Sequence, residues 1–443
     1  MTSPDVDNIL QLYQNVLTIG VLEYFQKQAG LKIRRGVYSA GVVLWLMILR
    51  RLHAVGTLAV TVQLLIQGAA DPLLVDCRRV RTRRISARTG ALSQALQKLP
   101  TLLCQQVSRE IVERLRKLLG LDNEPGVYLL DGSSTELEHS RELVRKFPPA
   151  SNQHGVSHWP VLKIVVLHEL HSGLAEEPAW GPMYGPKAVS EQELAEQALA
   201  RLPKGSSLVG DRNFGVLWVA HAAHKRDLGV LLRLTDVRAR KLFGGPIARE
   251  LEQPVTWEAG RWDGGKKSRL KPGTSVSGRL IAVRVGRGKS KKWFYFFTTL
   301  DWPPEKILEV YGLRWNIETD LRSLKRTVRL QHIAVKSEEM LTKELFLAVA
   351  AYNLTRGVMA LAARKKGMDP RQLSFAHVLN VVNCAWPKLA TASTSEEFQR
   401  EFNRILDLSA QCTLPKRKRQ RRYERSRWRH QNPFPYKDSK KTK

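Results

Sequence analysis

Apolar residues recur at helical spacing through the first part of the chain, up to about residue 124. This periodicity predicts helices over residues 8–28, 37–53, 58–67, 90–98 and 102–119. We therefore expect an all-helical N-terminal domain over residues 1–124.

The pattern changes near Pro125, where short apolar runs replace the helical spacing. They predict strands over 126–131, 161–170, 174–183, 207–211 and 229–235, with helices over 190–201 and 216–225. Strands that alternate with helices are typical of an α/β domain, here residues 125–235. The first and fourth strands end in Asp131 and Asp211. If these strands are neighbours, both carboxylates emerge at the same edge of the sheet.

The rest of the chain divides into three stretches. Residues 236–302 favour strands at 254–257, 278–285 and 292–299, separated by glycine and proline pairs, which predicts a β-rich insertion. Residues 303–412 return to helical spacing, with a helix opened by Pro303 and Pro304 and further helices over 341–364 and 374–383. Residues 413–443 form a basic tail, expected to be disordered on its own.

Four polar side chains define a stripe on the helix that follows Pro304. Tyr311, Arg314, Glu318 and Lys325 stand at offsets of 0, 3, 7 and 14. On a regular helix they fall within an arc of about 60°, beside an apolar arc that anchors the helix in a core. A carboxylate flanked by cations and a phenol suits a metal ion held against a nucleic-acid backbone. The competing interpretation is a surface ion pair between Arg314 and Glu318.

The charge of the chain indicates what kind of partner it binds. The net charge is +31, from 72 basic against 41 acidic residues, and indicates a polyanion, most commonly nucleic acid. An anionic membrane is the rival, but the basic residues are spread through folded-looking sequence. The basic segment 78–84, which leads into a short helix, is a candidate DNA-docking element, with a solvated loop as the alternative.

The lack of a recognisable targeting signal and the spacing of the cysteines lead us to expect a cytoplasmic protein. The longest apolar run, residues 37–49, is too short to span a bilayer, and the N-terminus does not read as a signal peptide. The four cysteines lie far apart without a Cys-x-x-Cys pair, so we expect a reduced protein without a zinc site. His168 and His171 fall on opposite faces of a predicted strand, which also argues against zinc.

Asp131, Asp211 and Glu318 are the candidate metal ligands. Hard divalent cations such as Mg²⁺ prefer oxygen ligands and share their remaining positions with water and substrate phosphates. Two such ions about 4 Å apart can activate an attacking hydroxyl and stabilise a leaving oxygen in phosphodiester chemistry. An aspartate at a strand end can equally be a turn or cap residue.

The stripe reads Tyr-x2-Arg-x3-Glu-x6-Lys. It matches, at every position and spacing, a motif of the DDE transposases of bacterial insertion sequences, specifically the insertion-sequence-four family. The chain therefore resembles this family. Asp131-Gly132-Ser133 and Gly210-Asp211-Arg212 are similar to the family's first and second aspartate motifs, with Asn213 a mild departure. Ser337 and residues 352–356 are similar to the region after the glutamate. The resemblance runs from about residue 40 to the tail.

The resemblance implies an α/β fold with a ribonuclease-H-like catalytic core, a β-rich insertion and helical N-terminal DNA binding. It implies that Asp131 bridges two Mg²⁺ ions, which Mn²⁺ can replace, while Asp211 holds one ion and Glu318 the other. Phosphates would be held by Tyr311, Arg314, Lys325 and Arg212. A dimer in the synaptic complex would cut the terminal inverted repeats of its element in double-stranded DNA and join the exposed 3′-hydroxyls to target DNA.

Other functions stay open at this point. A catalytically retired DNA-binding protein or repressor is the alternative, and a nuclease that cuts without joining is a third; the intact acids, motif and basic tail favour the active enzyme. Some family members flip a base onto an aromatic residue. Trp257, Trp262 and Trp293 in the insertion are candidates for that role, with strand packing as the alternative.

Overall fold

The computed structural model describes residues 18–415, except 33–35, 54–56, 75–76, 123–124, 154, 261–269, 287–290, 332 and 392–393. The start of the first expected helix, Trp262 and the basic tail from residue 416 onward lie outside the described residues.

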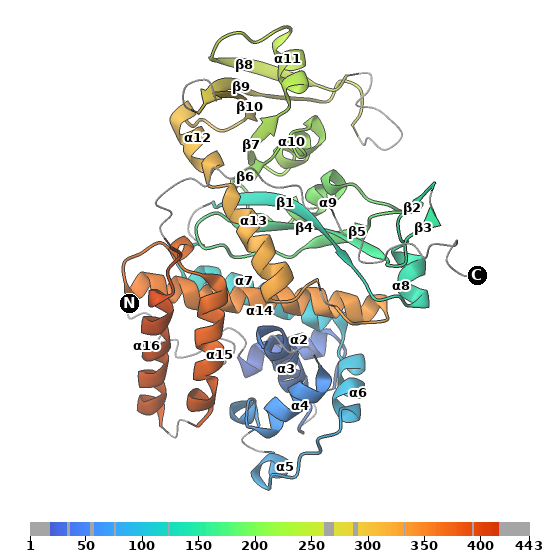
Figure 1. Ribbon diagram of the computed structural model, residues 1–443, viewed down its shortest axis with the longest axis vertical. Helices are drawn as coiled ribbons and strands as arrows, with labels where there is room; N and C mark the ends of the chain where they lie inside the picture. Colours follow the sequence, from blue (N-terminus) through green and yellow to red (C-terminus); the bar gives the residue numbers. More distant parts are fainter. Residues whose placement is uncertain are drawn as a thin grey trace, which may run out of the picture.

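One mixed sheet of eight strands, in the order β5-β4-β1-β6-β7-β10-β9-β8, runs from the middle of the molecule to its upper end in Figure 1, where β8 to β10 lie. The strands are β1 (Val127–Glu136), β4 (Val161–Glu169), β5 (Ala179–Pro182), β6 (Ser207–Gly210), β7 (Gly229–Leu234), β8 (Leu251–Glu258), β9 (Ser275–Val285) and β10 (Lys292–Thr298). Strand β1 is antiparallel to β4 and parallel to β6, and β6 is parallel to β7. The expected α/β class is confirmed.

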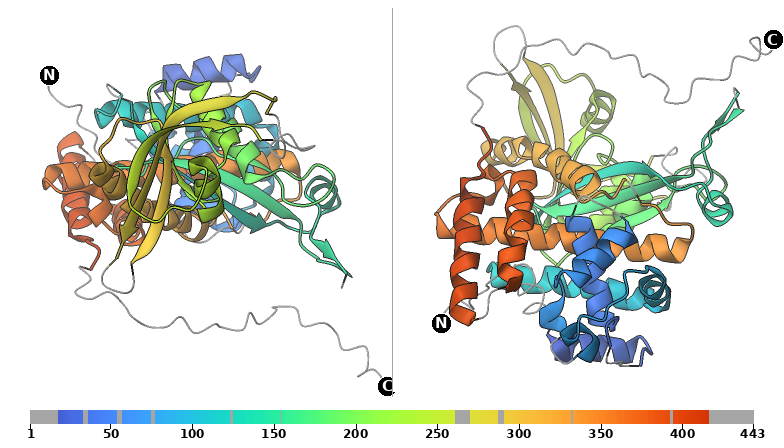
Figure 2. Two further views of the ribbon diagram at one scale, coloured as in Figure 1. Left: turned by 90° about the horizontal axis from the view of Figure 1, so that it is seen from above. Right: turned by 60° about the horizontal axis from the view of Figure 1, so that its bottom comes forward.

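The three strands of the expected insertion continue this sheet. β10 pairs antiparallel with β7, and β9 and β8 follow outward. Helix α11 (Asp236–Phe243) leads from β7 into this region. A separate hairpin, β2 (Ser151–Asn152) with β3 (Gly155–Val156), extends beside α8 (Arg141–Lys146) at the side of the molecule (Figure 2).

Strand side chains alternate between two cores, one on each face of the sheet. Leu129, Val209 and Leu231 belong to the core that includes side chains of α7 (Thr101–Leu118) and of the segment around Glu318. Tyr128, Leu130, Leu208 and Val230 belong to the core shared with α9 (Glu191–Leu199) and α10 (Leu217–His224). The sheet is therefore covered by helices on both faces.

Short helices make up the N-terminal part, as the periodicity predicts. They are α2 (Ile19–Gln28), α3 (Ala40–Leu52), α4 (Leu58–Ile66), α5 (Arg78–Arg81) and α6 (Gly90–Lys98), with a 3₁₀ turn, η1 (Asp71–Leu73). The predicted bounds agree within about three residues where they are described. The basic segment expected as a loop contains the one-turn helix α5, whose arginines are exposed.

Helix α14 (Glu338–Lys365) lies across the molecule between the sheet and the N-terminal helices (Figure 1). Ser337 caps its N-terminus by accepting a hydrogen bond from the Met340 N–H at 3.3 Å. By length and composition this helix could cross a membrane, but 94% of its most apolar window is buried inside the protein. It is the central core helix, packed on α7 and α3.

Two further helices, α15 (Phe375–Thr391) and α16 (Ser395–Gln411), follow the turn η4 (Pro370–Gln372) and pack on each other and on α14. The sequence pattern predicts the first of them but not the second. Thr394 caps α16 by accepting from the Glu397 N–H at 3.1 Å, a Thr-x-x-Glu signal that was available in the sequence.

The segment that carries the polar stripe is not one regular helix, contrary to our expectation. Helix α12 (Pro304–Gly312) ends before Arg314, α13 (Trp315–Arg322) follows, and a π-helical turn, η3 (Ser323–Thr327), succeeds it. At the junction Arg314 N–H donates to Tyr311 O and Ile317 N–H to Arg314 O, hydrogen bonds between residues three apart, as in a 3₁₀-helix. The segment therefore tightens at Arg314 and widens at η3, so the spacing of its side chains departs locally from regular 100° steps.

Candidate active site

Asp131 and Asp211 follow the last paired residues of two neighbouring parallel strands. Pairing between β1 and β6 ends at Leu130 and Gly210, which lie opposite each other. The aspartates come next on each strand, and both alternate onto the face of Leu129 and Val209. The expectation that they reach one sheet edge therefore agrees with the register. One detail differs, since β1 does not end at Asp131 but continues to Glu136 against β4.

The surroundings of Asp131 disfavour a lone negative charge. Burial raises the pKa of Asp131 to about 6; the negative charge of Asp211 adds to this shift, while the Gly132 N–H, which donates to Asp131 Oδ1 at 2.8 Å, and Arg314 oppose it. A carboxylate desolvated beside another carboxylate is a position where a bound cation is favourable.

Glu318 reaches this region from α13, which packs against β1 on the same face as the aspartates. Its Oε1 accepts from Arg314 Nη2 at 3.4 Å, the ion pair that the sequence offered as the alternative interpretation. The positive charge of Arg314 also lowers the pKa of Asp131, against the effect of burial. Among the residues that the structure describes, no three His, Cys, Asp or Glu side chains are close enough to hold a metal ion.

The other residues of the motif make different contacts. Lys325 Nζ donates to Ser133 Oγ at 2.9 Å and to Ser134 O at 2.8 Å, which fastens η3 onto β1 just beyond Asp131. A cavity of about 450 Å³ opens beside this lysine. Tyr311 is buried, its ring edge-on to Phe296 at 4.8 Å between centroids. Arg212 is exposed, and its carbonyl accepts from Arg238.

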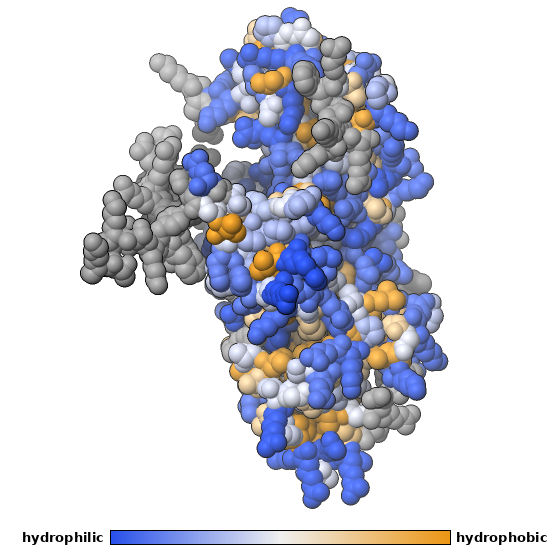
Figure 3. Space-filling model, turned by 90° about the vertical axis from the view of Figure 1, so that its right-hand side faces the viewer, coloured by the Kyte–Doolittle hydropathy of each residue, from blue (hydrophilic) through white to orange (hydrophobic). Residues whose placement is uncertain are grey.

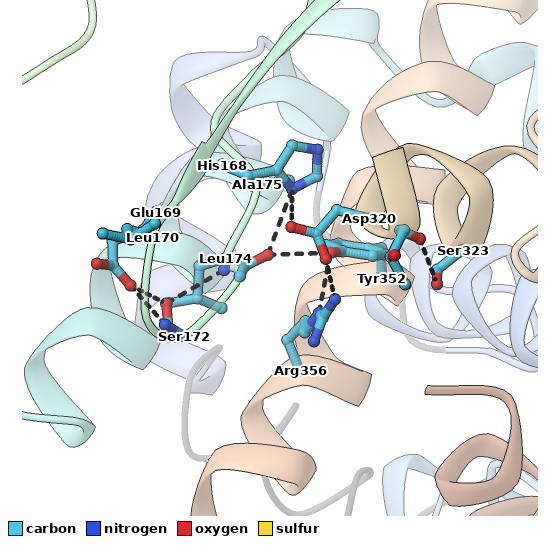
Figure 4. A network of polar contacts seen from close by, with 12 residues as sticks. His168, Glu169, Leu170, Ser172, Leu174, Ala175, Asp320, Ser323, Tyr352 and Arg356 are labelled. Atoms are coloured by element: carbon cyan, nitrogen blue, oxygen red, sulfur yellow. Dashed lines mark hydrogen bonds and ion pairs between the residues drawn. The ribbon is translucent and has the colours of Figure 1, made fainter. Parts of the chain in front are cut away.

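A buried polar network holds the glutamate helix in place (Figure 4). Asp320, two residues after Glu318, is fully buried and pairs with Arg356 of α14 and with Arg371, whose Nη1 lies 2.7 Å from Asp320 Oδ2. Arg356 Nε donates to the Tyr352 hydroxyl at 2.9 Å, and that hydroxyl donates to Gly173 O at 3.0 Å. The segment 352–356, which resembles the family's region after the glutamate, thus fixes the orientation of α13.

His168 also faces this network. Its Nδ1 lies 3.3 Å from Gly173 O and 3.9 Å from Asp320 Oδ2. Burial lowers the pKa of His168 to about 4, although Asp320 opposes the shift. The histidine is therefore a neutral core residue.

We predict that His168 contributes a loss in the free energy of unfolding as the pH is lowered from about 6.5 towards 4. In this window His168 takes up a proton in the unfolded chain but not in the folded one, so through this residue acid favours unfolding. Asp131 and Glu176, whose pKa values are raised to about 6 and about 7, contribute with the opposite sign. Denaturant titrations at several pH values would measure the slope, and His168→Gln should shift it in the direction of greater relative stability in acid. An equal slope in the variant would remove His168 as a source of the slope.

The tryptophans of the insertion take up packing roles where they are described. Trp257 stands edge-on to Phe297 at 5.0 Å between centroids, and Trp293 lies beside Tyr295, with Arg284 over its ring. Trp315, which was not among the candidate tryptophans, is 62% exposed at the start of α13 with Arg314 over its ring.

The mixed sheet carries two acids at adjacent strand positions, and a third acid lies on a helix across the same face. This arrangement is typical of α/β proteins that place carboxylates at a sheet edge. A family model described as a transposase DDE domain matches residues 122–354, a range that contains all three acids. The chain belongs to this family of metal-dependent enzymes that cleave and transfer DNA, and the family implies a ribonuclease-H-like core.

A curated relative agrees with this assignment. The transposase InsG for insertion sequence element IS4 of Escherichia coli (strain K12) is 26% identical over 305 residues, which cover 66% of this chain and 66% of the relative. The chain thus spans just under two thirds of the length of this relative, whose name assigns it to the element IS4. DDE domains generally use divalent metal ions, and transposases act on DNA.

Proposed function

We propose that this protein is an active DNA transposase that binds the terminal inverted repeats of an insertion sequence, cleaves them and joins the 3′-hydroxyl ends to target DNA. The observation that carries the proposal is the placement of Asp131 and Asp211 side by side at the sheet edge, with Glu318 on the helix across the same face.

The chemistry of the three carboxylates suits a hard divalent cation, because such ions prefer oxygen ligands. In the described structure the three are not gathered closely enough to hold an ion, and Glu318 is paired with Arg314. A cation would offset the cost of burying the charge of Asp131 and its repulsion from Asp211, the two effects that raise the pKa of Asp131. Asp131 would contact both of two Mg²⁺ ions, with Asp211 on one and Glu318 on the other after it exchanges Arg314 for the cation. The ions would supply activation of the attacking hydroxyl and stabilisation of the leaving oxygen. Mn²⁺ would substitute for Mg²⁺.

The cations around the acids would hold DNA phosphates. Arg314 and Lys325 flank the aspartates, Tyr311 packs behind Arg314, and Arg212 is exposed directly after Asp211. Exposed arginines in and after α5 would add backbone contacts, and the molecular face drawn in Figure 3 is mostly hydrophilic. Phosphate contacts of this kind position DNA without reading its sequence.

The domain arrangement is part of the proposal. The N-terminal helices up to residue 124 would dock the DNA, residues 125–235 and 303–412 would form the catalytic core around the insertion 236–302, and residues 413–443 would add non-specific affinity. The protein would act in the cytoplasm, as a dimer in the synaptic complex.

The test is a cleavage assay on the DNA that flanks the gene, where the ends of the element should lie. Purified protein with Mg²⁺ should produce a 3′-hydroxyl at the repeat boundary and then join it to a second duplex. Binding to the repeats without any cleavage would instead support a retired DNA-binding protein, and cleavage without joining would support a nuclease.

We expect Lys325→Ala to reduce the slope of log K against log[salt] for repeat binding by about 1, because one phosphate contact is lost. Lys365→Ala is a matched control, because Lys365 pairs with Asp407 on the C-terminal helices. Gel-shift titrations at several salt concentrations give the slopes. An unchanged slope would leave Lys325 as a structural tie to Ser133 and Ser134 alone.

A further inference from the structure

Glu191 approaches the two aspartates from the opposite side of the sheet. It is the first residue of α9, whose start is fixed by a capping box between Ser190 and Glu193. A Cβ on Gly132 would lie 2.6 Å from the Glu191 carboxyl group. The glycine after Asp131 therefore gives this side chain the room to reach the catalytic edge from the α9 layer.

A hydrogen-bonded bridge connects Glu191 to Asp211. Asn213 donates its side-chain N–H to Glu191 Oε2, and its backbone N–H donates to Asp211 Oδ1 at 2.8 Å. Gln192 Nε2 donates to Asn213 O at 2.8 Å and so holds Asn213 against the start of α9. Asn213, which the sequence analysis treated as a departure from the family pattern, is the link between the two carboxylates.

The charge of Glu191 acts on both aspartates. The negative charge of Glu191 raises the pKa of Asp131, and the negative charge of Asp211 raises the pKa of Glu191; burial is the largest cause of both shifts. Lys163 is the cation that counters Glu191, and its Nζ is held by Val189 O at 2.9 Å. Two cations, Lys163 and Arg314, beside the carboxylates of Asp131, Asp211 and Glu191 still leave a local excess of negative charge, which attracts a cation.

We propose that Glu191 is a positioning residue of the cation site: through Asn213 it orients Asp211, and its own negative charge strengthens the binding of divalent cations at Asp131 and Asp211. This inference rests on the proposed function and adds a fourth carboxylate to the three of the motif. Groups that orient metal ligands in this way commonly change metal affinity by about 10–100-fold when they are replaced.

The experiment titrates Mn²⁺ into the full-length protein without DNA at pH 8 and follows the free ion by electron paramagnetic resonance. Glu191→Gln removes the charge while its amide oxygen can still accept from Asn213. We expect it to weaken Mn²⁺ binding by about tenfold. Glu196→Gln, on the same helix but bonded to Trp218, should bind Mn²⁺ as the unaltered protein does. Thermal unfolding of each variant checks that the fold is retained.

Two results are decisive. If Glu191→Gln bound Mn²⁺ as tightly as the unaltered protein while Asp131→Asn bound it weakly, this inference would be overturned and the proposed function would stay intact. If Asp131→Asn also bound Mn²⁺ normally, the cation site itself would be refuted. A loss in Glu191→Gln and Asp131→Asn but not in Glu196→Gln supports Glu191 as part of the site.

Discussion

Asp131→Asn should lower the rate of Mg²⁺-dependent cleavage at a terminal repeat by at least about 10³-fold, the scale on which removal of a transition-state-stabilising group acts. Asp211→Asn and Glu318→Gln should have the same effect. Each change removes one carboxylate charge from the proposed cation site while it keeps the shape of the side chain. Single-turnover cleavage of a labelled repeat duplex measures the rate, and gel shifts should show repeat binding largely retained.

Asp301→Asn is a suitable control, because Asp301 is an exposed aspartate in the turn before α12. It should cleave at the rate of the unaltered protein. If one of the three acid variants cleaved normally, that residue would be removed from the catalytic set; if all three did, the assignment of this sheet edge as the active site would fail.

The second large effect is on stability. Asp320→Ala should lower the free energy of unfolding by about 3–5 kcal/mol, because it leaves the guanidinium groups of Arg356 and Arg371 buried without their counter-ion. Burial alone would raise the pKa of Asp320, but Arg356 and Arg371 hold it below its usual value, so the carboxylate is charged in the folded protein. Denaturant unfolding followed by circular dichroism measures the loss.

Lys204→Ala breaks an exposed ion pair with Asp227 and is the comparison, since an exposed pair contributes little. It should leave the unfolding free energy nearly unchanged. Equal effects of the two substitutions would mean that the buried network does not stabilise the protein.

The part of the site that the sequence predicts is the part that local patterns determine. Asp131 and Asp211 each follow a short apolar run, and strand periodicity alone assigns them to one edge once the strands are neighbours. Arg314 and Glu318 are four residues apart, so their ion pair follows from helical spacing. The strands of the sheet were found within a few residues because β-branched and leucine-rich runs are bounded by glycine and proline.

The remainder depends on contacts between residues far apart in the sequence. Lys325 bonds to Ser133 and Ser134, and Glu191 meets Gly132 and Asn213, contacts that no local pattern encodes. The regular-helix assumption failed between Tyr311 and Lys325 because tertiary packing imposes a tight and then a wide turn there. Asp320 offered one signal: it is three residues from the buried Ile317, on the apolar side of its helix, where a charge requires a partner.

Helix α14 has a consequence for how this chain can be divided. Its apolar surface is covered by α3 and α7 from the N-terminal part, and it carries Glu344, whose carboxylate pairs with Arg50 and Arg51 of α3. Arg51 also donates to Arg329 O, just beyond η3. A chain that began at residue 125 would expose the apolar surface of α14 and leave Glu344 without its arginine partners, so the N-terminal helices and the rest of the described chain form one cooperative folding unit rather than separable modules.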